Sequence, residues 1–171
     1  MTLEEKKQEF IDAWGVLGPK WGISKTMAHM HALMLVSNEA LCASKIKEKL
    51  DISIGNVNMN LKCLINWGLI EGKSVEGERK EFFVAEKDMW KAFTKIVRKR
   101  KENELLPLLD ILSKLSSIET SDIDENEEEA KNFDATMSEL STFAKKADGM
   151  LDKFISAENS WLLKGYRMMI R

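Results

Sequence analysis

The sequence predicts a mainly α-helical fold with one small β-hairpin. Three observations in residues 43–85 support it: two helix-period apolar stripes, a turn between them, and two short apolar runs joined by a polar segment that contains glycine. A helix, a tight turn, a longer helix and a hairpin in this order are typical of a winged helix-turn-helix. Helix-period stripes also precede and follow this segment. We therefore expect a winged helix-turn-helix flanked by N- and C-terminal dimerisation helices.

The first helix of this segment should run from Ala43 to Leu50. Ala43, Ile46 and Leu50 lie three and four residues apart, and lysine and glutamate occupy the opposite side. Ile52 follows in the turn, where it can fill the space between the two helices. One face of this helix is therefore expected to be buried and the other solvated.

The longer helix should begin after Ser53, whose hydroxyl can accept a hydrogen bond from a free amide of the first turn. It should end before Gly68, where a residue in the left-handed conformation is needed. Its buried stripe consists of Val57, Leu61, Leu64 and Ile65. Opposite this stripe lie Gly55, Asn56, Met59, Lys62 and Asn66, with Asn58 and Asn60 on the flanks.

The outward face of the longer helix is rich in amides and nearly free of acid. Asparagine can form a bidentate pair with adenine, and lysine can reach guanine or a phosphate. Asparagine is also a weak helix former, so the amides between positions 56 and 60 lower helix propensity without a return in packing. We therefore expect this helix to read base edges in the major groove. The expected contacts are Ser53, Gly55, Asn56, Asn58, Met59, Asn60 and Lys62, with Ser53, Asn56, Asn60 and Lys62 as leading candidates.

The hairpin should consist of strands at Leu69–Ile70 and Glu81–Val84 and of a connecting wing, residues 74–80. Gly77 permits the turn, and Arg79 and Lys80 lie at its tip. A guanidinium there can enter a narrow minor groove, where the negative potential is enhanced. We expect Arg79 and Lys80 to contact DNA at the minor groove or the backbone. The alternative is a solvated loop in which neighbouring glutamates balance the two cations.

Four strings between Phe10 and Trp90 carry a family resemblance: FIDAWG, WGISKTMAHMHALML, SIGNVNMNLKCLINWGLI and GERKEFFVAEKDMWK. This segment, roughly half of the chain, resembles the GbsR-type branch of the MarR superfamily of bacterial and archaeal transcriptional regulators. The resemblance implies a homodimeric winged helix repressor or activator with a recognition helix at Ser53–Trp67. It also implies that Arg79 takes the role of the wing arginine. A response to choline is implied for some relatives.

Charge is divided unevenly along the chain. Residues 1–101 contain 18 lysines and arginines against 13 aspartates and glutamates, whereas residues 102–171 contain 8 against 15. A basic N-terminal part and an acidic C-terminal part are consistent with a protein in which only the N-terminal part contacts DNA phosphates. The dense basic cluster Arg98–Lys101 either contacts phosphate or forms a solvated face.

Helices are also expected before the winged segment. Thr2 and Glu5 form a capping box for a helix that the pair Gly18-Pro19 should end. A second helix should span Ser24–Val36, with His31 on its apolar stripe as a core or dimer-contact residue. The N-terminal stripe, from Leu3 to Leu17, needs a partner surface.

Further helices are expected after the hairpin. Residues 86–117 should form one long helix, or a pair bent near Pro107 because proline removes a hydrogen bond. A helix-period stripe extends from Ala130 to Phe154, and a last helix should contain Trp161. These stripes are wider than a small winged helix core can cover, so a partner chain is the natural cover. We expect an N-terminal dimerisation helix at 1–22, a DNA-binding domain at 23–101 and a helical dimerisation region at 102–171.

Other kinds of site have little support. Cys42 and Cys63 are too few and too far apart for a metal site, and the segment Asp122–Asn126 begins like an EF-hand loop without its glycine or its final glutamate. We find no nucleophile paired with a base, no paired carboxylates and no phosphate loop, so we expect neither an enzyme nor a cofactor. The N-terminus does not read as a signal peptide, and no apolar run is long enough to cross a membrane. We expect a soluble, cytoplasmic protein.

The expected function is that of a homodimeric, sequence-specific transcriptional regulator. Its expected partners are double-stranded DNA with a pseudo-palindromic operator and a second copy of the chain, with a small-molecule effector as a further candidate. The alternative is a winged helix that binds proteins without DNA readout, which would need an apolar rather than an amide-rich outward face. The five tryptophans are expected in the core, and an aromatic cage for a quaternary ammonium ligand is the alternative.

Overall fold

The computed structural model describes residues 1–115 and 127–157. The chain forms two compact units, Met1–Lys95 and Ile96–Arg171. The first contains α1 (Leu3–Leu17), the 3-10 turn η1 (Gly18–Trp21), α2 (Lys25–Val36), β1 (Leu41–Cys42), α3 (Ala43–Leu50), α4 (Ile54–Asn66), β2 (Ile70–Lys73) and β3 (Phe82–Ala85). Next come α5 (Met89–Arg100), the π-helical segment η2 (Lys101–Leu105), α6 (Leu106–Leu115) and α7 (Glu127–Ser156). The expected fold, mainly α with a small antiparallel sheet, is confirmed.

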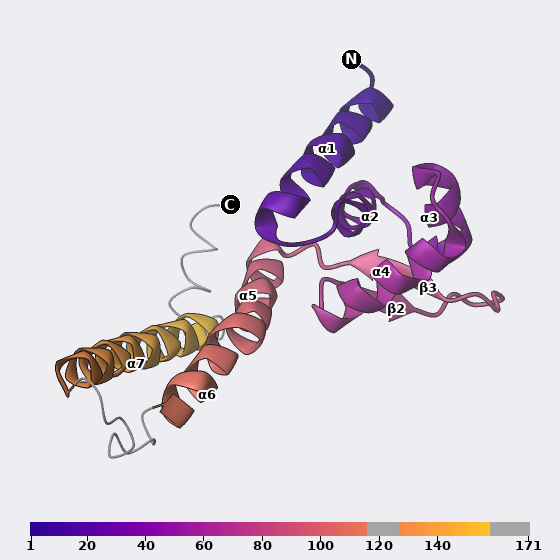
Figure 1. Cartoon of the computed structure of the whole chain (residues 1–171). Helices are drawn as coiled ribbons and strands as arrows, with labels where there is room; N and C mark the ends of the chain where they lie inside the picture. Colours follow the sequence, from indigo (N-terminus) through magenta and orange to yellow (C-terminus); the bar gives the residue numbers. More distant parts are fainter. Residues whose placement is uncertain (116–126, 158–171) are drawn as a thin grey trace, which may run out of the picture. The chain divides into compact units, whose positions relative to one another are not determined.

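The core of the first unit is built around α2. Met30 and Met34 are almost completely buried, and so are Ala28 and Ala32. The helices α1, α3 and α4 all contact α2 (Figure 1). This arrangement leaves one long side of α4 free, because its buried side chains, Val57, Leu61 and Leu64 among them, face the core.

The ends of the predicted helices are confirmed by their hydrogen bonds. The backbone amide of Thr2 donates to the Glu5 carboxylate at 2.7 Å, and the amide of Glu5 donates to the Thr2 hydroxyl at 3.2 Å, which completes the capping box of α1. Helix α4 starts after Ser53, whose Oγ accepts from the amide of Asn56 at 3.2 Å. It ends at Asn66, shortly before Gly68, which has φ 69°, and the amide of Leu69 donates to the Leu64 carbonyl at 3.0 Å.

The small sheet has the order β1-β3-β2, and both pairs are antiparallel. Its hairpin pairs Ile70 with Ala85 and Lys73 with Phe82, so β2 is longer than the predicted strand Leu69–Ile70. Strand β1 was not predicted. It contains two residues, and its partner β3 is far away in the sequence, so only the tertiary contact makes it a strand.

The region after the hairpin forms two helices, but the irregularity lies one turn before Pro107. The amide of Leu106 donates to the carbonyl of Lys101, five residues back, which defines the π segment. Pro107 has no amide hydrogen and its ring crowds the preceding turn. A π segment just upstream absorbs this misfit while the chain stays helical.

Some expectations concern residues that the structure does not describe. The EF-hand-like segment Asp122–Asn126 and the last predicted helix around Trp161 both lie outside the described residues. Among the residues that are described, no helix is long and apolar enough to cross a membrane.

Candidate nucleic-acid interface

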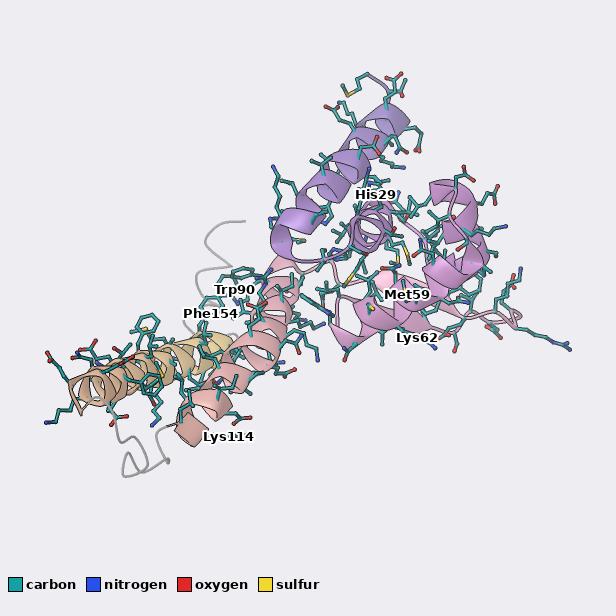
Figure 2. All side chains as sticks on the ribbon, viewed as in Figure 1. His29, Met59, Lys62, Trp90, Lys114 and Phe154 are labelled. Atoms are coloured by element: carbon teal, nitrogen blue, oxygen red, sulfur yellow. The ribbon has the colours of Figure 1, made fainter. Side chains whose placement is uncertain are left out.

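The outward face of α4 is accessible along most of its length. Ser53, Gly55, Asn58, Met59 and Lys62 are exposed, and Asn56 is half-buried. The labels of Met59 and Lys62 show where this helix lies in Figure 2. A side chain added at Gly55 would meet no atom within 4 Å, so the backbone is open there to close approach by another molecule. No acidic residue occurs in α4.

Asn60, which was expected on a flank of the outward face of α4 as a leading candidate for a DNA contact, is buried instead. This residue is only 3% exposed. Its Oδ1 accepts a hydrogen bond from the Ser24 hydroxyl at 3.1 Å, and its Nδ2 donates to the carbonyl of Asn56 at 2.9 Å and to Asn56 Oδ1 at 2.7 Å. Position 60 follows Val57 by three residues and therefore lies on the buried side of the helix. Its partner Ser24 is remote in sequence, which the local pattern could not reveal.

These contacts form a chain of amides and hydroxyls that ends at the surface. The Ser24 hydroxyl caps α2 by accepting from the amide of Met27 at 3.0 Å and donates onward to Asn60. Asn60 in turn holds the side-chain carbonyl of Asn56. Because one acceptor site of that carbonyl is engaged, its orientation is held, and the Asn56 amide nitrogen keeps its two protons for a contact outside the chain. We call Ser24, Asn60 and Asn56 the amide relay.

The wing follows this helix in the sequence, and all of its residues are exposed. Every residue from Glu71 to Glu81 is exposed, and Figure 1 shows the connection between β2 and β3 as a loop that projects from the sheet. Gly77 has φ 83° and open space around it, and the amide of Glu78 donates to the Val75 carbonyl at 3.1 Å. Arg79 and Lys80 follow this turn directly.

Lys87 fixes the base of the hairpin and was missed by the sequence analysis. Its Nζ donates to the carbonyls of Met34 and Ser37 at 3.0 and 2.9 Å, and also to the carbonyl of Leu35. These carbonyls lie at the C-terminal end of α2, which has no basic residue in its last turn. A cation satisfies such carbonyls and complements the helix dipole. Burial lowers the pKa of Lys87. The lack of a basic residue in the last turn of α2 indicated that another residue must satisfy these carbonyls, but the sequence did not show that Lys87 does so.

The basic cluster Arg98–Lys101 is largely neutralised by carboxylates of its own unit. Lys99 pairs with Glu102 at 3.2 Å, and Arg100 pairs with Glu104 at 3.7 Å. Lys101 pairs with Asp148 at 2.9 Å and also with Asp152. Hydrogen bonds to Asp152 and Asp148 raise the pKa of Lys101. These pairs favour a structural surface over a phosphate contact.

The two histidines lie in the packing between α1 and α2. His31 is buried, and burial lowers the pKa of its imidazole to about 4. Its ring lies 6.4 Å from Trp14, so His31 is a core residue, one of the two roles expected for it. The ring of His29 packs against Gly15, where a Cβ would lie 1.8 Å from Nε2. Among the described residues, no group of three metal-binding side chains is found.

Trp14 and Trp21 pack in an aromatic cluster with Phe10, but neither lies fully in the core as expected: Trp14 is half-buried and Trp21 is 38% exposed. Trp14 lies 5.1 Å from Phe10 and 4.9 Å, edge-on, from Trp21. Such tilted and edge-to-face contacts are typical of aromatic packing.

Comparisons with known proteins give likenesses to solved structures only. No protein-family model matches the chain, and neither does any curated protein. A crystal structure of a transcriptional regulator is similar over 90% of this chain and 97% of that chain, with 15% sequence identity and a TM-score of 0.67. This likeness shows a shared fold.

Two crystal structures of the adhesin competence repressor AdcR from Streptococcus pyogenes also match. They cover 86% of this chain and 98% of their own, with 18% and 20% identity. Their TM-scores of 0.37 and 0.36 are too low to add to the argument.

Proposed function

We propose that this protein is a sequence-specific DNA-binding transcriptional regulator that acts as a homodimer. The observation that carries the proposal is the outward face of α4, which is largely exposed, free of acid and capped at Ser53. The hairpin whose exposed turn bears Arg79 and Lys80 comes next in the chain. Basic and amide side chains on an accessible helix are the groups that read base edges. The fold shared with a transcriptional regulator supports this function.

The recognition helix, α4 with its cap, enters the major groove in this proposal. Its contacts come from Ser53, Gly55, Asn56, Asn58, Met59 and Lys62. Asn60 does not contact DNA itself but holds the Asn56 side chain in place through the amide relay. The Asn56 amide then meets an acceptor such as a purine N7, guanine O6 or thymine O4. Met59 supplies an apolar contact of the kind that thymine methyl groups accept.

The wing, residues 74–80, lies along the minor groove or the backbone. Arg79 enters a narrow groove while Lys80 pairs with a phosphate. The projection of this loop from the sheet and its full exposure support the role. The glutamates around the two cations support the alternative of a solvated loop, and the variants described below separate the two.

The dimer is formed by helices outside the DNA-reading part, from residues 1–22 and 102–171. Leu3, Val16 and Leu17 on α1 are exposed, as are several large apolar residues on α6 and α7. A two-fold dimer requires a pseudo-palindromic operator with half-sites about one helical turn apart, ~34–36 Å. The cytoplasmic location and a small-molecule effector stay predictions.

A protein-binding winged helix is the second candidate, and two residues favour it. Ile54 is 47% exposed and Met59 is 60% exposed on α4. Exposed apolar residues on one helix can serve a protein partner. However, amides and lysine intervene between them, and a purely apolar face is not present.

Selection of bound sequences from a random duplex pool tests the proposal. Full-length protein should enrich a pseudo-palindrome within a few rounds, and the two half-sites should be spaced by about one turn of DNA. A pool that stays unenriched while the protein remains folded by circular dichroism would contradict sequence-specific binding and favour the second candidate.

A further inference from the structure

Gly55 is a glycine that neither backbone conformation nor packing requires. It is the second residue of α4, and it does not belong to the glycines with positive φ in the described part of the chain, which are Gly22, Gly68 and Gly77. A Cβ added at Gly55 would meet no atom within 4 Å. Glycine is a poorer helix former than any other residue except proline. Gly55 therefore lowers the helix propensity of α4 without a return in packing.

The missing side chain leaves an open notch on the outward face of α4. Met59 lies one turn further along the same face, and Ile54 directly precedes the glycine; both side chains are exposed. Methionine is flexible and polarisable, so it adapts to the shape of the group that it contacts. We call the open backbone at Gly55, together with Ile54 and Met59, the Gly55 notch. The notch admits close approach by another molecule, and its edges are apolar.

Asn56 supplies hydrogen-bond donors beside the notch. It follows Gly55 directly, and its side chain is held because the buried Asn60 donates to Asn56 Oδ1 at 2.7 Å. The amide nitrogen of Asn56 keeps two protons for an acceptor outside the chain. The first turn of α4 therefore offers an apolar notch and a fixed donor next to each other.

One base presents the complement of this pair in the major groove. Thymine carries an acceptor, O4, next to the methyl group on C5. Cytosine presents a donor in place of that acceptor and has no methyl group. Adenine and guanine present acceptors but no apolar group. A notch beside a donor therefore matches thymine better than any other base.

We propose that each operator half-site contains a thymine that α4 reads at two atoms. The Gly55 notch receives the methyl group, with Ile54 and Met59 against it, and the Asn56 amide donates to O4. The inference rests on the proposed DNA binding and deepens it by naming a base that the operator contains and the residues that select it.

Deoxyuridine tests the methyl contact, because it keeps O4 and pairs with adenine but lacks the methyl group. In the operator obtained from the random pool, the thymines of one half-site are replaced one at a time. Binding of the full-length protein is measured by fluorescence anisotropy. Burial of one methyl group is worth about fourfold in affinity, so replacement of the thymine in the notch should weaken binding by about that factor.

Gly55→Ala tests whether that methyl group lies in the notch. The added methyl group should weaken binding to the thymine operator by about fivefold or more, because a packed contact resists extra volume. Deoxyuridine at the same position should restore most of this loss, because it removes the opposing methyl group. Alanine raises helix propensity, so the loss should occur in a protein that stays folded, which circular dichroism checks.

The matched control for this variant is Gly149→Ala. Gly149 is an exposed residue of α7 at which an added Cβ would also meet nothing within 4 Å. The control adds the same methyl group to a helix outside the DNA-reading part. It should bind both duplexes as the wild type does.

Met59→Ala tests the apolar edge of the notch. It should reduce the fourfold preference for thymine over deoxyuridine to near one, because the methyl group loses its partner. Ile65→Ala, which truncates an exposed apolar residue near the other end of α4, should keep the preference of the wild type.

Two results would overturn this inference and leave DNA binding standing. One is an operator in which every thymine can be replaced by deoxyuridine without loss of affinity. The other is a sensitive thymine whose preference is the same in the wild type, Gly55→Ala and Met59→Ala. A pool that yields no operator would overturn the proposed function and this inference with it.

Discussion

At the residue scale, the sequence predicted the amide-rich face of α4 but not the amide relay behind it. The amide-rich face of α4 was predicted from composition and spacing, and Asn56, Asn58, Met59 and Lys62 are accessible to different degrees as expected. Asn60 is buried instead, because Ser24 offers it a hydrogen-bond partner from α2. A buried amide is tolerated only where such a partner exists. Local periodicity placed position 60 near the boundary of the two faces and did not reveal that partner.

A double-mutant cycle tests the relay. Asn56→Ala should cost about 1–3 kcal/mol on the preferred site and little on random duplex, because it removes a base contact. Asn60→Ala should lose a similar part of the preference by freeing the Asn56 side chain. The two losses should not add, because both act through the same contact. The readout is the ratio of affinities for specific and random DNA.

The control for this cycle is Asn66→Ala, which removes an exposed amide near the far end of α4. Its affinity ratio should match that of the wild type. Additive losses from Asn56→Ala and Asn60→Ala would mean that Asn60 does not position Asn56. A purely structural Asn60 would lower stability in urea and leave the affinity ratio unchanged.

His31 gives a prediction for the pH dependence of stability. Burial lowers the pKa of His31 to about 4 in the folded protein, against an ordinary value of 6.5. The unfolded chain therefore binds a proton more readily, so stability falls as pH drops through this interval and is fully present above it. Between pH 7 and pH 5 this one group should remove about 2 kcal/mol of unfolding free energy.

The measurement is urea unfolding of the wild type and of His31→Phe at both pH values. The variant lacks the titrating group, so its stability should fall less between pH 7 and pH 5. An identical fall in both proteins would show that His31 is not buried in its neutral form.

At the element scale, helices were predicted better than strands. The caps of α1, α2 and α4 are local. Thr2 and Ser53 hold the first turns of α1 and α4 as predicted, and Ser24, where the second helix was expected to begin, caps α2. Strand β1 and the Lys87 contact to α2 depend on residues distant in sequence. Pro107 indicated an irregular helix, but the π segment appears one turn earlier because the misfit is relieved upstream.

The wing is the element whose role is tested most simply. Lys80→Ala should reduce the salt slope of DNA binding by about one and leave the preferred sequence unchanged, because a phosphate contact carries no sequence information. Arg79→Ala should weaken sites with narrow, A-tract-like minor grooves most. The measurement is fluorescence anisotropy over a range of salt concentrations on duplexes with and without an A-tract.

Lys73→Ala is the control for the wing, because Lys73 is an exposed lysine in β2 before the turn. It should change affinity less than either wing variant. A wing with no influence on affinity or on its salt dependence would be a solvated loop, and the recognition helix would act alone.

At the scale of the whole molecule, the uneven distribution of charge along the sequence parallels the division of the chain into two compact units. The first unit holds the exposed helix α4 and the wing, and the second is an acidic helical unit whose α7 presents an apolar stripe. Composition and stripe width predicted a DNA-binding part and a dimerisation part, and these two roles stay predictions.

The most direct test of the central claim is the salt dependence of binding to a random-sequence duplex by the full-length protein. We predict a steep linear decrease of log Kobs with log salt, with a slope of about −0.9 for each phosphate contacted by lysine or arginine. We also predict a shallower slope for Lys80→Ala. Undetectable binding at low salt, or an affinity that does not change with salt, would contradict the claim that this protein binds duplex DNA.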